Sequence, residues 1–440
     1  MKRSIVISGI VFLLFLPQQS DGQKVGLDPR NILERFDVAK DGDALIVPVE
    51  FQGKTYRFLL DTGASVTVFD TSLEPQLGQT IGEAWAKGPR GKKLVKLYAS
   101  PKAHLGKLSL QTKGPIASLD LTKIREVSGE PIFGIVGMDF LSHKVIYIDF
   151  DKGAFSILKK QKSSGKGFKI TYTQGRPHVR AHLPGHGAEE VLLDLGNISS
   201  GGGDLRAAVL ATLNKQKKAI LAGKTFSETV SGTDGLSVFQ VESVSFGGFA
   251  VPKLHFHQAD KSCIGTGFLS RFNVTLDFLN HEMHLEKGKQ FHRSDSLDMS
   301  GLHIVRKKGK TIIHSIDAGS PADLQGMKPK DVIEKIGVLD ASQTRLFVLR
   351  KLLSSEGKEV SVTLVRSKRS IPWPLSSIPV VGGASAKEEK VVRLSLKNWR
   401  KDRQTQITHE TGLKKSTRER PSCPALPSYR PASISSGLRP

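Results

Sequence analysis

The sequence has few cysteines, and it has no long apolar segment after its first 17 residues. Only two cysteines occur in 440 residues, Cys263 and Cys423, which excludes a disulfide framework as the basis of the fold. No run after Pro17 is long and apolar enough to span a bilayer. Acidic residues are also few, because 42 Asp and Glu stand against 65 Lys and Arg, a formal net charge of +23. Hydrophobic cores must therefore hold the folded part together.

The positive charge does not by itself indicate nucleic-acid binding. Residues 366–440 hold 16 Lys and Arg against 5 Asp and Glu, and the remaining excess is spread without a dense basic run. No recognisable nucleic-acid motif accompanies it. We expect weak contact of the basic tail with polyanions or membrane surfaces at most, and no specific nucleic-acid partner.

The N-terminus has the order of a secretory signal peptide. Lys2 and Arg3 precede an apolar run, Ile5–Pro17, and a polar stretch follows. No cysteine follows that run, so we do not expect lipid attachment. The sequence predicts a signal peptide over residues 1–23 and an exported protein that is periplasmic, in the cell envelope or secreted. A single N-terminal anchor is the alternative.

The chain contains one internal repeat. Residues 47–63 (VPVEFQGKTYRFLLDTG) align with residues 179–196 (VRAHLPGHGAEEVLLDLG), and each segment ends in two leucines followed by Asp-x-Gly. Further along, residues 135–150 (IVGMDFLSHKVIYIDF) align with residues 263–278 (CIGTGFLSRFNVTLDF). Two matches in the same order and at similar spacing indicate a duplication.

The duplication predicts two homologous lobes, residues 38–160 and 168–290. Within each lobe, short apolar strands alternate with Gly and Pro turns, which favours a mostly β architecture. The polar segment Lys159–Lys166 between them has the composition of a linker. We refer to the two segments as the first copy and the second copy.

Asp61-Thr62-Gly63-Ala64-Ser65 after an apolar strand, together with Ile135-Val136-Gly137, resembles the aspartic proteases of the retroviral and pepsin type. The resemblance implies an endopeptidase that acts on peptide or protein substrates, with Asp61 and Asp194 as the catalytic pair and no cofactor. Two carboxylates about 3 Å apart share one proton. One can then take a proton from water while the other donates to the scissile carbonyl oxygen.

The same resemblance assigns supporting roles around the two aspartates. The Thr62 hydroxyl would brace the lobes, Ser65 would hydrogen-bond an Asp61 oxygen, and Gly63 would let the facing lobe approach closely. The chain around Gly91–Ser100 is a candidate for a flap that covers the substrate. Three further glycines occupy matching positions in the repeat: Gly196, Gly137 and Gly265.

The second copy departs from the family pattern. Leu195 replaces the bracing Thr, Asn197 stands in place of Ala64, and Ile198 stands in place of Ser65. Three hypotheses therefore stay open. The dyad forms within one chain, or two Asp61 residues pair in a homodimer, or the protein is a non-catalytic pseudoprotease that holds peptides as a scaffold.

Residues 301–366 resemble a PDZ domain. The similarity lies in the stretch IIHSIDAGSPADLQGMKPKD, followed by Val332 and Ile333. It implies a small α+β domain over residues 299–366 that binds protein C-termini by strand addition. Its carboxylate-binding loop would consist of Gly301, Leu302, His303 and Ile304.

The rest of the chain, residues 367–440, is rich in Pro, Ser and basic residues. Few of its apolar residues recur with a period, so we expect a disordered tail, with a short amphipathic segment at Val391–Trp399 as the one exception considered. The histidines do not predict a metal site. His255 and His257 alternate on an expected strand, but no cysteine or acidic residue accompanies them at a suggestive spacing.

Overall fold

The computed structural model describes residues 27–88, 91–159, 167–198, 201–229, 232–367, 387–397 and 399. The chain forms one compact unit up to Lys397 and a second from Asn398, of which the structure describes Trp399. The signal peptide predicted over 1–23, most of the expected linker and most of the tail lie outside the described residues. Among the helices of the described ranges, none has the length and apolarity needed to cross a membrane.

Nine strands of the first copy form one sheet, in the order β5-β6-β9-β4-β10-β3-β2-β7-β8. The strands are β2 (Ile46–Phe51), β3 (Lys54–Leu60), β4 (Val68–Asp70), β5 (Thr80–Gly88), β6 (Gly91–Tyr98), β7 (Ala103–Leu105), β8 (Leu108–Ser109), β9 (Ile116–Leu119) and β10 (Ile132–Val136). The helices are η1 (Pro29–Asn31), η2 (Thr71–Leu73), α1 (Glu74–Leu77), α2 (Thr122–Ser128) and α3 (Met138–Leu141).

Eight strands of the second copy form another sheet, in the order β14-β15-β16-β21-β17-β20-β19-β18. The strands are β14 (Thr171–Thr173), β15 (Arg176–Leu183), β16 (Gly187–Leu193), β17 (Gly203–Arg206), β18 (Ala219–Thr229), β19 (Gly232–Phe246), β20 (Phe249–Ala259) and β21 (Cys263–Ile264). The helices are α4 (Ala207–Lys215) and α5 (Thr266–Leu269).

The two sheets repeat one topology. The run β2-β3-β10-β4-β9-β6-β5 of the first copy corresponds strand by strand to β15-β16-β21-β17-β20-β19-β18 of the second. The directions also agree: β3–β10 and β16–β21 are parallel, β10–β4 and β21–β17 antiparallel, and β4–β9 and β17–β20 parallel. The duplication in the sequence is therefore a duplication of the sheet.

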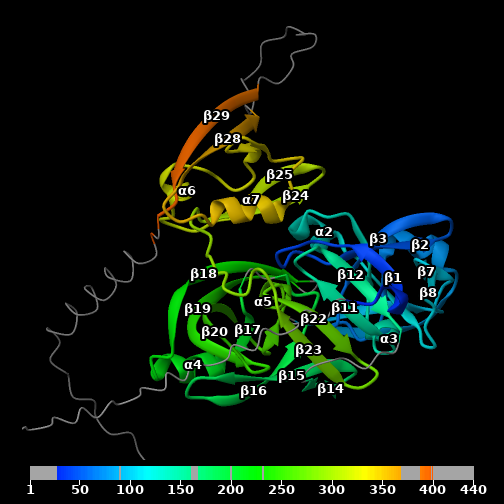
Figure 1. The fold of residues 1–440 in the computed structure, drawn as a ribbon. Helices are drawn as coiled ribbons and strands as arrows, with labels where there is room; N and C mark the ends of the chain where they lie inside the picture. The colour runs from blue at the N-terminus through cyan, green and yellow to red at the C-terminus, as the bar shows by residue number, and fades with distance from the viewer. Residues whose placement is uncertain are drawn as a thin grey trace, which may run out of the picture. The chain divides into compact units, whose positions relative to one another are not determined.

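A third sheet takes strands from both copies, in the order β1-β12-β11-β22-β23-β13. Its strands are β1 (Ile32–Asp37), β11 (Val145–Asp149), β12 (Ala154–Leu158), β13 (Phe168–Lys169), β22 (Phe272–Asp277) and β23 (Glu282–Lys287). β11 pairs with β22 in antiparallel fashion, with Tyr147 opposite Thr275. These residues also align in the repeat, so the pairing is symmetric about that position. Figure 1 shows β11 and β22 next to each other where the two copies meet.

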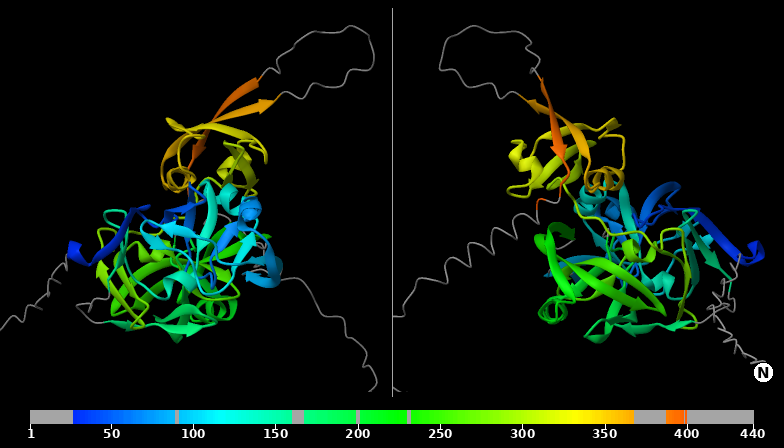
Figure 2. Two further views of the ribbon diagram at one scale, coloured as in Figure 1. Left: turned by 90° about the vertical axis from the view of Figure 1, so that its right-hand side faces the viewer. Right: turned by 60° about the vertical axis from the view of Figure 1, so that its left-hand side comes forward.

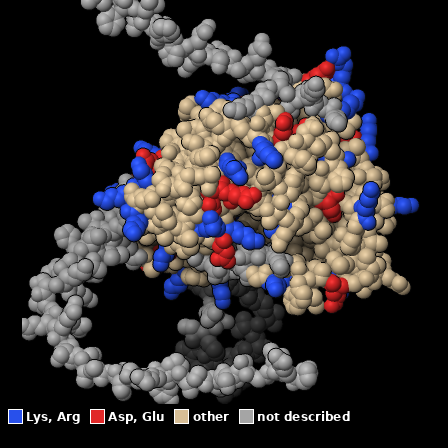
Figure 3. All heavy atoms as spheres, turned by 90° about the horizontal axis from the view of Figure 1, so that it is seen from below, with Lys and Arg blue, Asp and Glu red and all other residues tan. Residues whose placement is uncertain are grey.

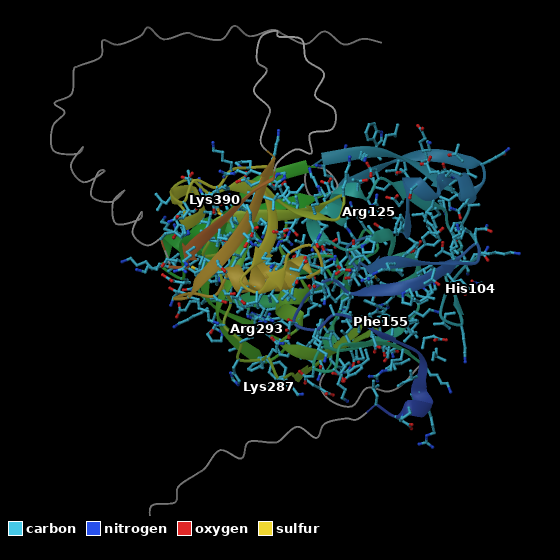
Figure 4. The ribbon with its side chains drawn as sticks, turned by 90° about the horizontal axis from the view of Figure 1, so that it is seen from above. His104, Arg125, Phe155, Lys287, Arg293 and Lys390 are labelled. Carbon is cyan, nitrogen blue, oxygen red and sulfur yellow. The ribbon has the colours of Figure 1, made fainter. Side chains whose placement is uncertain are left out.

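One hydrophobic core runs through both copies. It contains Phe58 and Phe155 of the first copy and Phe256 and Phe268 of the second, all almost fully buried. Phe155 is labelled in Figure 4 on the strand that pairs with β11. Because apolar residues alternate along most of these strands, one face of each sheet enters this core. The prediction of a mostly β fold with few helices is confirmed.

Residues after 300 form a smaller α+β module with its own core. Its sheet runs β24-β25-β26-β28-β29, and β27 pairs with β26. The elements are β24 (Leu302–Lys307), β25 (Lys310–Ile316), β26 (Val332–Ile336), β27 (Leu339–Asp340), β28 (Glu359–Ser367), β29 (Lys387–Ser395), α6 (Pro321–Leu324) and α7 (Leu346–Leu353). The α+β composition agrees with the prediction for this region, although its assignment as a PDZ domain stays a prediction.

The prediction of a disordered tail is wrong for Lys387–Ser395, of which only Val391–Ser395 falls within the amphipathic segment named above as an exception. Lys387–Ser395 forms β29, which pairs with β28 along its whole length. Glu359 lies opposite Ser395 at one end of the pairing, and Ser367 lies opposite Lys387 at the other. Figures 1 and 2 show the two strands side by side. Val392, Leu394 and Leu396 enter the module's core. These residues alternate with polar ones, a strand period that the overall Pro, Ser and Lys content of the tail concealed.

We predict that β29 stabilises the module. Leu394 is fully buried, so Leu394→Ala should lower the free energy of unfolding by about 2–5 kcal/mol. Val391 is 60% exposed on the same strand, and Val391→Ala should change it by about 0.5 kcal/mol or less. Calorimetric unfolding of both variants measures the effect. Equal changes in the two variants would show that β29 does not pack on the module in solution.

Candidate active site

Each copy brings an aspartate to the end of a central strand. Asp61 follows β3 and its N–H donates to the Val136 carbonyl at 3.1 Å. Asp194 follows β16 and its N–H donates to the Ile264 carbonyl at 3.0 Å. In both cases the acceptor belongs to the strand that pairs in parallel with the one before the aspartate. The two Asp-x-Gly turns therefore start from equivalent positions.

Each turn holds its carboxylate in the same way. Oδ1 of Asp61 accepts hydrogen bonds from the N–H groups of Gly63 at 2.7 Å and Ala64 at 3.1 Å. Oδ1 of Asp194 accepts them from Gly196 at 2.9 Å and Asn197 at 3.1 Å. Two backbone donors fix the orientation of each carboxyl group before any substrate arrives.

The two turns meet face to face. A Cβ atom on Gly63 would lie 2.8 Å from the Asp194 carboxyl carbon, and one on Gly196 would lie 2.5 Å from that of Asp61. Only glycine permits this approach from either side. The carboxyl groups of Asp61 and Asp194 are thereby within hydrogen-bonding reach of each other. The structure brings together the two aspartates that the sequence singled out.

The pair is arranged to share a proton. Burial raises the pKa of Asp61, although hydrogen bonds from Asp194 and from the turn oppose the shift. Burial, the charge of Asp61 and the hydrogen bond to Asp61 raise the pKa of Asp194 well above its ordinary value. Both residues keep some exposed surface. The pair therefore keeps a shared proton above the ordinary pKa of an aspartate, and it titrates as a unit.

Thr62 joins the two copies beneath the aspartates. Its buried hydroxyl donates to the Leu193 carbonyl at 2.5 Å and accepts from the Leu195 N–H at 3.0 Å. The equivalent residue of the second copy, Leu195, is fully buried in the common core instead. Thr62 thus makes the contact between the copies that was expected of it, and Leu195, which has no hydroxyl, makes no equivalent side-chain hydrogen bond to the first copy.

Gly137 and Gly265 also occupy places where a side chain would not fit. A Cβ on Gly137 would lie 2.5 Å from the Val66 carbonyl, and one on Gly265 would lie 2.2 Å from the Asn197 carbonyl oxygen. Each glycine precedes a short helix, α3 or α5, whose first N–H donates back to the aspartate turn. The two glycines thus let the helices clamp the turns.

Ser65 is placed differently from the expectation. Within the described ranges, the structure shows no hydrogen bond from Ser65 to Asp61, and the donors to that carboxylate in the turn are Gly63 and Ala64. The Ser65 carbonyl instead accepts from the Asp139 N–H at 3.2 Å. Two backbone donors already orient the Asp61 oxygen, so the hydroxyl is not needed for that purpose.

The sequence reasoning missed a buried support for the Asp61 turn. The Asp139 carboxylate accepts from the Thr67 N–H at 2.9 Å and from the Thr67 hydroxyl at 2.7 Å. The Thr67 hydroxyl accepts in turn from the Gly137 N–H at 3.3 Å. Asp139 aligns with Gly267 in the repeat, so the two copies do not share this residue and the repeat gives no signal for it.

The residues expected to form a carboxylate-binding loop lie at the start of β24. Gly301 has a φ of 74° and donates its N–H to Asp298 Oδ1 at 2.5 Å, and the Leu302 N–H donates to the Ser300 hydroxyl at 3.0 Å. His303 Nε2 lies 2.9 Å from Asp317, and the Ile304 carbonyl accepts from Arg350 at 2.7 Å. The Gly301 N–H, which the resemblance to a PDZ loop would assign to a peptide C-terminus, thus donates to the Asp298 carboxylate instead.

Among the residues that the structure describes, no group of three or more His, Cys, Asp or Glu could hold a metal ion. His257 does have an acidic neighbour, Asp204, which lies 53 positions away in the sequence. Sequence spacing could not reveal this pair, because it depends on how β17 pairs with β20.

Residues 47–140 match a family model described as aspartyl protease. The matched segment contains the Asp61 turn, Gly137 and most of the first-copy sheet. No curated protein matches the chain. The match supports a protease, and therefore a hydrolase, in general terms.

We predict that the Thr62 brace contributes to stability. Thr62→Val keeps the shape of the side chain but leaves the buried Leu193 carbonyl and Leu195 N–H without their partner, at a cost of about 1–3 kcal/mol. Thr62→Ser retains the hydroxyl and should stay closer to the wild type. Urea unfolding of both variants provides the measurement. A valine variant as stable as the serine variant would contradict the role assigned to the hydroxyl.

The raised pKa values also predict how stability depends on pH. The folded chain keeps the shared proton of Asp61 and Asp194 above the pH, about 4, at which unfolded aspartates lose theirs, so the contribution of the pair to stability falls as pH rises. Asp194→Asn should therefore gain stability relative to the wild type between about pH 4 and pH 8. Melting temperatures measured across that range test this difference.

Asp120→Asn is the control, because its effect on stability should change with pH in the opposite direction. Hydrogen bonds from Thr122, first of all from its side chain, lower the pKa of Asp120. The wild-type carboxylate therefore gains stability as pH rises through about 4, and the variant should fall behind it. If Asp194→Asn and the wild type followed parallel curves, the carboxyl pair would not hold its proton as described.

Proposed function

We propose that the protein is an aspartic endopeptidase in which Asp61 and Asp194 of one chain activate water to hydrolyse peptide bonds. The observation that carries this proposal is the pair of carboxyl groups, held by equivalent turns and hydrogen-bonded to each other. The aspartyl protease match over residues 47–140 supports the same class.

The chemistry follows from the proton that the two carboxyl groups share. Ionised Asp61 takes a proton from water as the water oxygen bonds to the scissile carbonyl carbon, while Asp194 donates its proton to the carbonyl oxygen. The tetrahedral intermediate then collapses. Asp61 gives its proton to the amide nitrogen, the C–N bond breaks, and a hydroxyl proton returns to Asp194. No covalent intermediate is formed, and the dyad ends in its starting state.

The geometry favours the one-chain dyad over a pair of Asp61 residues from two chains. Asp194 already occupies the position facing Gly63, and Thr62 bonds to the second copy of its own chain. It also weakens the pseudoprotease alternative. The second copy has Ile198 where the first has Ser65, so it lacks that hydroxyl. The backbone N–H groups that donate to Asp194 are nevertheless present.

The hairpin formed by β5 and β6 is suited to cover a bound peptide, and it includes most of the segment Gly91–Ser100 expected to act as a flap. Ile81, Trp85 and Leu94 on this hairpin are 60%, 63% and 47% exposed. Exposed side chains of this size on one hairpin are typical of a binding surface. We propose that they contact the substrate.

The remaining expectations stay as proposals. Export depends on residues 1–23, and contact with polyanions depends on the basic tail. Figure 3 shows one face of the molecule, on which Lys and Arg side chains are interspersed with Asp and Glu. For the loop at Gly301 to bind a protein C-terminus, Asp298 would have to withdraw from the Gly301 N–H.

Isosteric substitution of either aspartate tests the proposed function. Asp61→Asn and Asp194→Asn should each lower the cleavage rate of a diverse peptide mixture by about 1,000-fold or more, because each removes one partner of the proton transfer. Products are identified by mass spectrometry after incubation with the purified chain. Asp120→Asn, an exposed change outside the site, should cleave like the wild type.

The alternatives give different results in the same assay. If Asp194→Asn stays active and Asp61→Asn does not, the active site is a homodimer of Asp61 residues. If the wild type binds peptides but cuts none between pH 3 and pH 8, the protein is a non-catalytic binder. Wild-type size in solution, measured by light scattering, accompanies the assay to separate monomers from dimers.

A further inference from the structure

The strands that lead to the two aspartates have two faces. In the first copy, Leu60, Phe69 and Val136 enter the common core. Their neighbours Leu59, Val68 and Ile135 point to the opposite face, because successive side chains alternate along a strand. That opposite face forms a separate apolar cluster. We call its members Ala44, Leu59, Val68, Ala117 and Ile135 the apolar face.

The apolar face borders Asp61 at the junction of the two copies. Ala64, whose N–H donates to Asp61, packs against it. So does Ile198, which belongs to the second copy and lies four residues after Asp194. Ala84 and Ala86 of the β5–β6 hairpin cover it from another side. The members of the apolar face are themselves buried, so a peptide bound between Asp61 and this hairpin would meet the partly exposed Ala64 and Ile198 at its border.

The same face of the second copy is polar. Leu193, Leu205 and Ile264 enter the common core, so their neighbours take the opposite face. Strand register fixes the correspondence: Val68 lies opposite Ala117, and Asp204 lies opposite His257. In the repeat, Ala64 aligns with Asn197, Ile135 with Cys263, and Ala44 with Arg176. We call the second-copy residues Arg176, Asn197, Asp204, His257 and Cys263 the polar face.

Asp204 is the centre of the polar face. Its Oδ2 accepts from the Asn197 side-chain amide at 3.1 Å and from the Cys263 thiol at 3.3 Å. Its Oδ1 lies 3.2 Å from His257 Nδ1. The Asn197 amide also donates to the Cys263 sulfur at 3.0 Å. Three side chains therefore hold one carboxylate in a defined position.

This carboxylate lies beside the dyad and is open to solvent on one side. Asn197 connects the two, because its N–H donates to Asp194 and its side chain donates to Asp204. The Asp204 side chain is 23% exposed and that of His257 is 19% exposed. A carboxylate can accept about four hydrogen bonds, and the residues that the structure describes supply three to the Asp204 side chain. Asp204 can accept one more from a bound molecule.

The charges near the polar face favour a cation. The dyad carries one negative charge when it shares a proton, Asp204 carries another, and Arg176 carries one positive charge. Arg176 acts on Asp61, whose pKa its charge lowers. Cys263 adds no charge, because burial and the neighbouring carboxylates raise the pKa of its thiol well above the ordinary value. The surroundings are therefore negative when His257 is neutral.

We propose that Asp204 forms a subsite for a lysine or arginine side chain of the substrate, so that the enzyme cleaves between an apolar residue beside Ala64 and Ile198 and a basic residue near it. This inference rests on the proposed peptidase function. A purely structural role does not require these residues, since the first copy packs the same positions with Ala, Val and Ile.

The wild-type cleavage profile is the first test. The full-length chain is incubated with a peptide mixture of diverse sequence, and the residues around each cut are tabulated from mass spectra. Lys and Arg should be enriched at one position on one side of the cut, and apolar residues on the other side. A profile without basic residues at any fixed position would overturn the subsite, even if cleavage were efficient.

A pair of peptides then assigns the preference to Asp204. The peptides differ at the enriched position, which holds either lysine or norleucine, a side chain with the same four-carbon stem but no ammonium group. The wild type should show a kcat/KM at least about 10-fold higher for the lysine peptide, a modest ratio because Asp204 is partly exposed. Asp204→Asn and Asp204→Val should bring the ratio close to one, and the valine variant reproduces the first-copy residue.

Asp260→Asn is the matched control. Asp260 is exposed at the end of β20, and its replacement removes the same charge from a neighbouring surface position. It should leave the peptide ratio unchanged. If Asp204→Asn kept the wild-type ratio, or if Asp260→Asn abolished it, the subsite would be wrong while the peptidase stood.

Two further outcomes are distinguishable. If both Asp204 variants failed to fold or to cut either peptide, the wild-type ratio of the lysine and norleucine peptides would decide the matter, because a ratio near one contradicts the subsite. A wild type that cuts no peptide at all removes the proposed function and the subsite together.

Discussion

The structure depends on the contact between two Asp-x-Gly turns. Each glycine faces the other copy's carboxyl group so closely that no Cβ could intervene. This approach places two acidic groups in one partly buried site, which raises the pKa of both and makes a shared proton the favourable state. The surrounding sheets, the glycines before α3 and α5 and the Thr62 hydroxyl all serve to maintain that contact.

The site could be predicted from the sequence because its requirements are local. Asp-Thr-Gly after an apolar strand and an apolar pair before glycine are short motifs, and the duplication placed Asp194 as the partner of Asp61. The polar face could not be predicted in this way. Asp204, His257 and Cys263 come together only through the pairing of β17 with β20 and β21, which no local pattern encodes.

The error over β29 has a related cause. The composition of the segment after residue 366 suggested that it could not bury enough apolar surface. That composition is an average over 74 residues, and it hides the apolar residues of one short strand. Val392, Leu394 and Leu396 are sufficient once β28 offers them a pairing edge and a core. Asp139 was missed for a different reason. A search for residues shared by two copies cannot find a support that only one copy uses.

The second copy keeps the residues that both Asp-x-Gly turns need and differs where only one copy needs a residue. A hydroxyl can donate one hydrogen bond and accept others, so Thr62 alone satisfies both Leu193 and Leu195. The second bracing threonine is therefore dispensable, and Leu195 contributes to the core instead. The positions that changed from apolar to polar lie on the face toward the dyad, where the new side chains hydrogen-bond to Asp204 and to one another. Loss of the familiar motif around Asp194 is thus compatible with a working dyad, since the backbone donors and glycines that hold the carboxyl group are all retained.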